Sequence, residues 1–265
     1  MNKHISLLLG LIGAGICQIA VADSEDDLAK KLANPVAALI SVPIQANYDK
    51  DIGSNDGSVL RTNIQPVIPV SIGNDWNLIS RTILPIISQS DIPVNGAGES
   101  GIGDVLQSFF FSPKAPTSNG LIWGVGPAIL MDTASDATLG SEKWGIGPTG
   151  VVLKQEGPWT YGMLGNHIES FSGNSSRSDI SSTFVQPFVS YITKTKTTIG
   201  VNTESTYDWK AKQWSVPINF TVNQLLKVGN QLLQVGGGVR YWLDSPANGP
   251  DGWGLRLQVT LLFPK

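Results

Sequence analysis

The sequence predicts an all-β protein, a closed antiparallel transmembrane β-barrel of about twelve strands. Three observations support this class. Strand-like segments alternate apolar and polar residues, short turns alternate with longer polar loops, and all eight tryptophans lie near strand ends. The alternation is clearest in residues 250–265, where apolar positions are separated by residues that include Arg256 and Gln258. Because successive side chains of a strand point to opposite sides, one side of this strand is apolar and the other is polar.

Residues 1–22 have the form of a cleaved secretory signal peptide. Lys3 precedes an apolar stretch of about a dozen residues, and Ala20-Val21-Ala22 forms a small-residue cleavage site. Such a stretch is too short to span a bilayer well, and an uncleaved anchor is the alternative. The one cysteine, Cys17, falls inside this segment. The mature chain therefore offers neither disulfides nor thiol chemistry.

Residues 23–35 predict a short helix. Ser24 can cap it, acidic residues crowd its first turn, and Lys30 and Lys31 suit the negative end of the helix dipole. Asn34-Pro35 ends it. The helix could lie in the periplasm or inside the barrel lumen, and the sequence leaves both positions open.

Residues 36–265 form the predicted barrel. Its strand-like segments are 36–48, 58–72, 75–88, 103–112, 120–131, 142–155, 158–171, 179–193, 197–209, 213–225, 231–244 and 252–264. Clusters of Gly, Asn, Asp, Ser and Pro separate them, as turns and loops require. Most tight turns fall at one end and most longer loops at the other, which is the layout of an outer-membrane barrel. An even number of strands places both ends of the barrel on the periplasmic side.

The aromatic residues predict two membrane girdles. An indole ring has an apolar body and a polar tip, so it favours the headgroup level of a bilayer. A soluble core would place some tryptophans at strand centres, and none lies there. The short-turn end has Trp76, Trp123 and Trp159, and the long-loop end has Trp144, Trp209, Trp214, Trp242 and Trp253.

The apolar side of the strands is expected to face lipid and the polar side the lumen. The lumen of a soluble twelve-stranded barrel would be too wide for side chains to fill, and a β-sandwich would leave sheet edges. Closure also pairs every backbone group, which lipid demands. The predicted lumen and selectivity residues are Arg61, Asn63, Gln65, Arg81, Asp104, Asn202, Glu204, Asp208, Arg240, Arg256 and Gln258.

The four lumenal arginines should lie in one sector of the wall once the barrel closes. Acidic residues flank this sector, with Glu204 and Asp208 on one side and Asp104 on the other. Opposite charges across a water-filled bore would form a selective constriction. The alternative is a salt-bridged plug that only stabilises the lumen.

Prolines in the middle of strands argue against a regular hydrogen-bonded ladder. Proline cannot donate to a ladder and normally marks an edge or a bulge. We therefore expect a band of bulges halfway down the barrel, through which a lipophilic solute could leave sideways into the membrane. A ladder that runs unbroken past these positions would exclude that exit. The residues are Pro43, Pro66, Pro69, Pro85, Pro127, Pro148, Pro187 and Pro217.

Several segments resemble one family of outer-membrane barrels, the transporters named for the MetA-pathway of phenol degradation. The segments are Asn63-Ile64-Gln65-Pro66-Val67-Ile68-Pro69, Gly103-Asp104-Val105, Gly124-Val125-Gly126-Pro127, Lys143-Trp144-Gly145-Ile146-Gly147-Pro148, Asn202-Thr203-Glu204-Ser205 and Gly238-Val239-Arg240-Tyr241-Trp242. The resemblance covers most of the mature chain and includes the mid-strand prolines. It implies a channel or uptake porin and does not establish phenol as the cargo.

The function predicted from these features is passive passage of a small solute, aromatic or hydrophobic, through the outer membrane. The expected partners are the lipid bilayer, the barrel-assembly machinery and the solute. The chain has 18 Lys and Arg against 21 Asp and Glu, and loss of Lys3 with the signal leaves a net charge of −4. That acidic balance does not favour nucleic-acid binding, and no metal, nucleotide or cofactor motif occurs. Neither an enzymatic activity nor a cofactor is therefore expected.

Two other function classes stay open. A lipid hydrolase would need a hydroxyl nucleophile, a histidine base and an orienting acid. His167 is the one histidine of the mature chain, with Glu169, Ser170 and Ser172 close by in the sequence. The other class is a structural or surface barrel with a closed lumen, which would pass no current.

Overall fold

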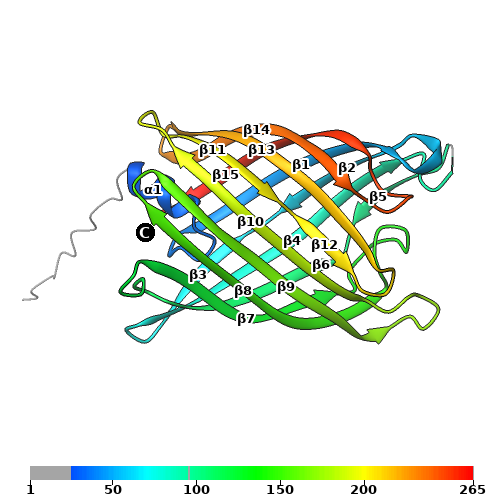
Figure 1. Ribbon diagram of the computed structural model, residues 1–265, viewed down its shortest axis with the longest axis horizontal. Coiled ribbons are helices and arrows are strands. Elements are labelled where there is room, and N and C mark those ends of the chain that lie inside the picture. The colour runs from blue at the N-terminus through cyan, green and yellow to red at the C-terminus, as the bar shows by residue number, and fades with distance from the viewer. Residues whose placement is uncertain (1–24, 95, 265) are drawn as a thin grey trace, which may run out of the picture.

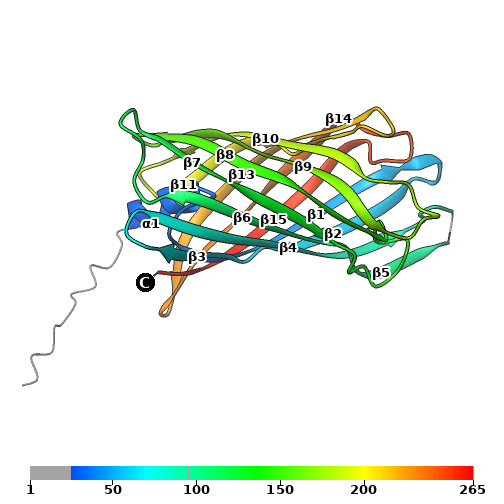
Figure 2. The same cartoon turned by 90° about the horizontal axis from the view of Figure 1, so that it is seen from below.

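The computed structural model describes residues 25–94 and 96–264. They form a closed antiparallel β-barrel with one short helix at the end where the chain also terminates (Figures 1 and 2). The predicted signal peptide and the proposed cap at Ser24 lie outside the described residues. No helix in the described part of the chain is long and apolar enough to cross a membrane.

The wall consists of twelve strands, as the sequence predicts. Three of them are divided into two segments each: β2 with β3, β5 with β6, and β11 with β12. The strand segments are β1 (Ile40–Ile52), β2 (Gly57–Ile64), β3 (Val67–Ile72), β4 (Trp76–Ser90), β5 (Gly98–Ile102), β6 (Val105–Pro113), β7 (Leu121–Met131), β8 (Lys143–Glu156), β9 (Trp159–Gly173), β10 (Ser181–Ile192), β11 (Thr197–Thr203), β12 (Ser205–Asp208), β13 (Gln213–Val228), β14 (Gln231–Asp244) and β15 (Gly252–Phe263).

Closure joins the last strand to the first. β15 pairs with β1 in an antiparallel register that runs from Ile40↔Phe263 to Tyr48↔Leu255. Each other wall strand pairs with its neighbours in the sequence. The sheet therefore has no free edge, which is the condition that lipid imposes on a spanning sheet.

The apolar side of the wall faces outward. In β15, Trp253, Leu255 and Leu257 are 59%, 57% and 68% exposed, whereas Arg256 and Thr260 are 2% and 1% exposed. Most of the large hydrophobic side chains on the other strands that are exposed follow the same alternation. The predicted orientation, with apolar side chains outside and charge inside, is therefore the one that the structure has.

The predicted band of mid-barrel bulges is wrong at most of the prolines. Pro43, Pro85 and Pro187 keep their register with Thr260, Asn63 and Met163 respectively. A register shift accompanies a proline only between Val216 and Pro217. The register gives no support to a lateral exit through a band of bulges.

Two Gly-Pro pairs show how the ladder tolerates its prolines. Pro127 and Pro148 lie opposite each other in β7 and β8. A Cβ at Gly126 would come within 2.0 Å of the Phe109 carbonyl oxygen, and one at Gly147 within 1.7 Å of the His167 carbonyl oxygen. Only glycine allows neighbouring backbones to approach so closely. Each proline is therefore preceded by a residue that lets the adjacent strand move inward.

The N-terminal segment occupies the short-turn mouth of the barrel. Helix α1 (Glu25–Leu32) buries Leu28 and Ala29 at 1% and 0% exposure. Leu28 packs with Leu39 against Leu225 of β13 and Leu262 of β15. The predicted first strand is therefore too long: residues 36–39 lie inside the barrel, and the wall begins at Ile40.

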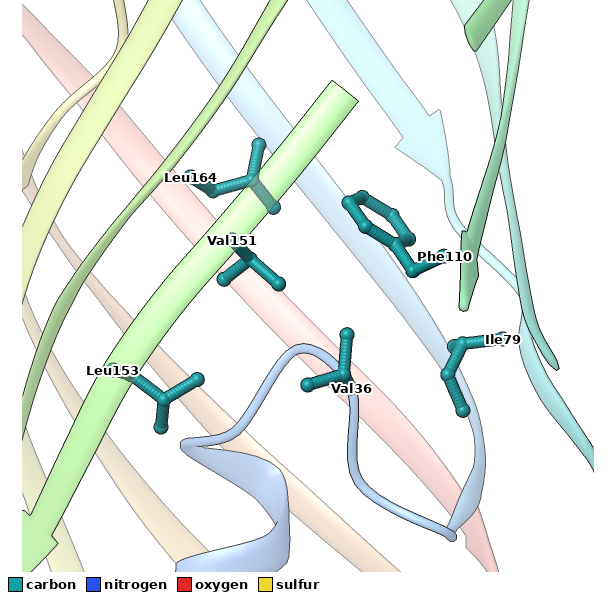
Figure 3. Packing of buried hydrophobic residues seen from close by; sticks show 6 residues of the cluster. All are labelled: Val36, Ile79, Phe110, Val151, Leu153 and Leu164. Atoms are coloured by element: carbon teal, nitrogen blue, oxygen red, sulfur yellow. The ribbon is translucent and has the colours of Figure 1, made fainter. Parts of the chain in front are cut away.

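Val36 extends the N-terminal segment deeper into the lumen. Figure 3 shows its side chain on the loop that follows α1, between residues of facing wall strands. It packs in one cluster with Ile79, Phe110, Val151, Leu153 and Leu164. Of the two positions that the sequence left open for this segment, the structure has the lumenal one.

Candidate functional site

A buried ion pair crosses the lumen at the level of Arg256, Arg240, Asp49 and Glu204, which we call the charged level. The Arg256 guanidinium donates to Glu204 from Nη1 and Nη2, at 2.9 and 2.7 Å, and from Nε to Asn47 Oδ1 at 2.7 Å. Glu204 lies where β11 gives way to β12, and β13 and β14 separate it from β15 along the wall. The pair therefore bridges two non-adjacent parts of the barrel. Its two-pronged geometry is the strong form of an arginine–carboxylate contact.

A second ion pair lies beside it. Arg240 Nη1 is 3.3 Å from Asp49 Oδ2, and both side chains are 7% exposed. Trp242 Nε1 donates to Asp49 Oδ1 at 2.9 Å, and the Arg240 guanidinium lies 4.8 Å from the centroid of the Trp242 ring. The girdle assignment of Trp242 is therefore wrong, because its indole points inward. Asp49 was missed because a sequence reading places it in a polar loop.

Two predicted lumen acids serve loops instead. Asp104 accepts hydrogen bonds from the backbone N–H groups of Thr133, Ala134 and Ser141 and from the Ser141 hydroxyl, at 2.6 to 3.2 Å. Asp208 accepts from the N–H groups of Lys210 and Ala211 at 2.8 and 2.9 Å. Both carboxylates hold turns at the long-loop end, and their predicted role in selectivity stays a prediction. A carboxylate at a strand end next to a Gly- or Ser-rich loop was the signal for this role.

The predicted polar residues lie on the inner wall, and three of them form local hydrogen bonds. Gln65 accepts from Arg81 Nη2 at 2.8 Å, and Asn202 accepts from Asn219 Nδ2 at 2.8 Å. Gln258 Nε2 donates to the Thr260 hydroxyl at 3.3 Å. The buried Oδ1 of Asn63 has no partner among the described residues.

The four arginines thus fall into two classes. Arg240 and Arg256 have carboxylate partners. Arg81 has an amide partner in Gln65, and no ion pair to Arg61 occurs within the described residues. The sequence offered a transverse field and a salt-bridged plug as alternatives, and the structure contains parts of both. Two arginines are neutralised in bridges, and two leave positive charge in the bore.

One half of the lumen is apolar, which the sequence analysis did not predict. Ile79 of β4, Phe110 of β6, Val151 and Leu153 of β8, and Leu164 of β9 all point inward and are at most 4% exposed (Figure 3). The four lumenal arginines, Glu204 and most of the amide side chains that line the bore lie on the rest of the wall, from β10 around through β15 and β1 to β4. The lumen therefore has an apolar wall facing a polar wall. Apolar runs without alternation, such as Val151-Val152-Leu153, were the available signal.

A cavity of about 260 Å³ lies between the N-terminal segment and the charged level. Residues of the N-terminal segment from Lys31 to Leu39 form one boundary, and Arg81, Glu204 and Arg256 form the other. Val67, Leu164 and Phe188 line its apolar side. Its polar side consists of Ser41, Gln45, Gln65, Gln186, Ser190, Thr198, Asn202, Thr221, Asn223, Gln234, Gln258 and Thr260. The cavity is thus a small amphipathic chamber in the bore.

His167 lies on the outer surface, on the strand face opposite to the inward-pointing Ile168. Its Nδ1 is 2.8 Å from Thr183 Oγ1, and its Nε2 is 3.1 Å from Glu169 Oε1. Trp209 Nε1 donates to the same Thr183 hydroxyl oxygen at 2.8 Å. The hydroxyl beside the histidine is therefore Thr183 of the neighbouring strand, and not Ser170 or Ser172 as the sequence suggested.

Six of the predicted girdle tryptophans form close aromatic pairs. Trp76 and Trp123 meet edge to face at 5.8 Å between ring centroids, and Trp159 meets Tyr191 at 4.8 Å. The remaining pairs join Tyr207 to Trp209, Tyr207 to Trp214 and Tyr241 to Trp253, at 4.8 to 5.0 Å. Trp144, which forms none of these pairs, is 38% exposed. Among the described residues, no group of three or more His, Cys, Asp or Glu that could hold a metal ion occurs.

Comparison with known proteins supports the fold. No protein-family model matches the sequence, and no curated protein matches it. Among solved structures, the chain is similar to an outer membrane channel of Pseudomonas putida F1, with a TM-score of 0.65 and 16% identity over 85% of this chain and 96% of that one. It also matches outer membrane phospholipase A of Escherichia coli, with a TM-score of 0.49 and 7% identity over 84% and 96% of the two chains.

At these identities the likeness concerns the fold alone. The chain has the architecture of an outer-membrane barrel, and the likeness to the phospholipase carries no argument about chemistry. The resemblance to the family named for the MetA-pathway of phenol degradation stays a prediction, because no family model matches.

Proposed function

We propose that this protein is an outer-membrane channel that gives passive passage to a small solute. The observation that carries the proposal is the amphipathic chamber of about 260 Å³ within a closed barrel whose outer face is apolar. An apolar exterior suits acyl chains, and a bore with both apolar and charged walls suits a solute that is neither fully polar nor fully apolar. The similarity in fold to a channel from Pseudomonas putida F1 supports the same class.

The N-terminal segment sets the size of the path. It fills the short-turn mouth through buried contacts of Leu28, Leu39 and Val36 with the wall. Its polar attachments include the ion pair of Asp26 with Lys196 and the hydrogen bond from Gln155 Nε2 to the Lys30 carbonyl oxygen at 2.9 Å. A solute larger than the chamber requires this segment to shift. We therefore propose a narrow path for small molecules, with neither ATP nor covalent chemistry.

The remaining parts of the proposal follow from the barrel class. Residues 1–22 would direct export and be removed, and the barrel-assembly machinery would insert the mature chain into the outer membrane. Arg61 and Arg81 would attract anionic or polarisable groups into the bore. The cargo is expected to include aromatic or hydrophobic compounds, as the family resemblance implies.

Conductance across planar bilayers and liposome swelling with a panel of small aromatics, sugars and amino acids test the proposal. A disulfide that ties the N-terminal segment to the barrel wall makes the test specific to the lumen. The Val36 Cγ1 atom lies 3.2 Å from the position that a Cβ at Gly124 would take, so Val36→Cys/Gly124→Cys can form a disulfide in a mature chain that has no other cysteine.

The oxidised variant should conduct less than its reduced form, and each single cysteine variant should respond to neither treatment. A wild-type barrel that passes neither ions nor any solute of the panel would contradict a channel. That result would favour a structural barrel with a closed lumen.

The lipid-hydrolase alternative has one specific observation in its favour. His167 lies between the Thr183 hydroxyl and Glu169, which is the order of groups in a nucleophile–base–acid arrangement. The Thr183 oxygen also accepts from Trp209, and this network is equally explained as a clamp between β9 and β10. If His167→Ala removed a phospholipid deacylase activity from the purified protein, the hydrolase would replace the channel. We expect no such activity in either form.

A further inference from the structure

We propose that the chamber is a binding site for a small aromatic carboxylate that carries a second polar substituent, such as a ring hydroxyl. The inference rests on the proposed channel function and names the solute class. Three features of the chamber support it: a cation at one boundary, an apolar wall beside it, and a pair of unpartnered polar atoms on the opposite wall.

Arg81 supplies the cation. It lies on the inner face of β4 and lines the chamber, and Gln65 is its hydrogen-bond partner among the described residues, at 2.8 Å. A guanidinium has five N–H donors and matches a carboxylate in a two-pronged geometry. Arg256, at the same boundary, already has Glu204 and Asn47 as partners. Of the two arginines at this boundary, Arg81 is therefore the one with donors left for a ligand.

The apolar wall beside Arg81 suits a ring. Val67 lies directly opposite Arg81 in the β3–β4 ladder. Val67 and Phe188 pack against the apolar cluster that contains Leu164, and all three line the chamber. Aromatic rings favour edge-to-face or offset contact with another ring, which Phe188 can supply. A carboxylate on Arg81 would place an attached ring against this wall.

The polar wall contains a pair of buried atoms without partners. Thr198 of β11 and Asn223 of β13 lie directly opposite each other, and each is 8% exposed. Thr198 Oγ1 and Asn223 Oδ1 have no hydrogen-bond partner among the described residues, and neither does Ser190 Oγ on β10. Buried polar atoms in folded proteins are normally paired with protein, water or ligand. A ligand hydroxyl could accept from Thr198 and donate to Asn223.

The size and charge of the chamber narrow the class of ligand that it can bind. About 260 Å³ is below the range of about 300–1,000 Å³ that is usual for drug-sized ligands, so one substituted ring is the appropriate scale. Glu204, the carboxylate at the chamber boundary, is held by Arg256, and the other charged residues of the lining, Arg81 and Lys31, are both cations. An anion therefore fits better than a cation.

Isothermal titration of the detergent-solubilised full barrel tests the proposal without requiring transport. The probes are 4-hydroxybenzoate, its neutral amide 4-hydroxybenzamide, benzoate and acetate. We expect 4-hydroxybenzoate to bind with the highest affinity. Loss of the carboxylate charge or of the ring should weaken binding at least about 10-fold, and loss of the hydroxyl a few-fold, since hydrogen bonds to charged groups are the stronger ones.

Three variants assign the contacts. Arg81→Gln should weaken 4-hydroxybenzoate binding about 10-fold and leave the amide unaffected, whereas Arg81→Lys should restore part of the affinity. Thr198→Val should remove the advantage of 4-hydroxybenzoate over benzoate. Arg177→Gln is the matched control, because it removes one arginine from a long loop where it pairs with Glu142 at 3.4 Å. Heat-modified migration in SDS gels verifies that each variant is folded.

The outcomes separate this inference from the proposed function. Equal affinity for the acid and its amide, or for 4-hydroxybenzoate and acetate, would overturn the aromatic-carboxylate site. So would the absence of all binding in a barrel that conducts ions, although the channel would then stand. Binding without conductance would retain the site and overturn the channel.

Discussion

Arg61 offers the sharpest test of the charged level. It lies opposite Asn47 in the β1–β2 ladder, and Asn47 accepts a hydrogen bond from Arg256 on the adjacent strand β15. The four lumenal arginines and the two carboxylates that pair with them, Asp49 and Glu204, have a summed formal charge of +2. Arg61→Ala should halve this charge without breaking an ion pair. Anion preference should therefore fall while the fold stays intact.

The size of the effect follows from Coulomb's law. An ion that passes about 5 Å from a guanidinium in a water-filled bore gains or loses about 0.8 kcal/mol at a dielectric constant near 80. That energy corresponds to about a fourfold change in the local concentration of the ion. Arg61→Ala/Arg81→Gln, which removes both uncompensated charges, should change the concentration about 15-fold if the two contributions add.

Reversal potentials in a salt gradient measure this preference directly. They should move toward cation preference in Arg61→Ala, further in the double variant, and not at all in Arg177→Ala. Arg240→Ala, the other substitution that the sequence suggested, is a poor partner for this experiment because it leaves the buried Asp49 unpaired. Unchanged reversal potentials in the folded double variant would refute the argument that Arg61 and Arg81 set the charge of the bore.

Three further predictions concern stability and gating. Glu204→Gln leaves Arg256, which is 2% exposed, without its carboxylate and should cost about 3 kcal/mol of folding stability, read as a lower unfolding temperature in SDS gels; an unchanged transition would show that the pair is solvated. Leu28→Asp places a charge among buried leucines and should loosen α1, with larger or more frequent conductance steps, whereas Glu25→Ala on the exposed side of α1 should match wild type. Asp104→Ala removes four hydrogen bonds to residues 133–141 and should make this loop more sensitive to limited proteolysis at unchanged conductance; equal cleavage rates would count against the anchoring role.

The fold could be predicted from the sequence because a membrane wall is a local pattern. A strand such as β15 must alternate apolar and polar side chains, and each turn must contain residues that favour turns. Tryptophans of the outer face favour the headgroup level of the bilayer. These requirements act on residues a few positions apart. The twelve strands and the outward apolar face could therefore be predicted from the sequence. Helix α1, with its acidic first turn and basic last turn, could be predicted as well.

The charged level was only partly predictable, since its contacts join residues distant in the chain. Arg256 and Glu204 were both identified as lumenal, but their pairing across two intervening strands depends on barrel closure and tilt. Asp49 was not identified, because its neighbours Lys50 and Asp51 make it look like part of a loop. Its contact with Arg240 and Trp242 spans most of the sequence.

The apolar half of the lumen was missed for a different physical reason. An apolar side chain that points into a water-filled bore is unfavourable. The apolar positions of an alternating strand therefore normally identify the side that faces lipid. Here the N-terminal segment brings Val36 into the lumen, and Phe110 and Leu153 have an apolar partner to cover. The loss of alternation in β8 and the amphipathic N-terminal segment are therefore two parts of one arrangement. A barrel strand that is apolar on both sides indicates that something apolar lies inside.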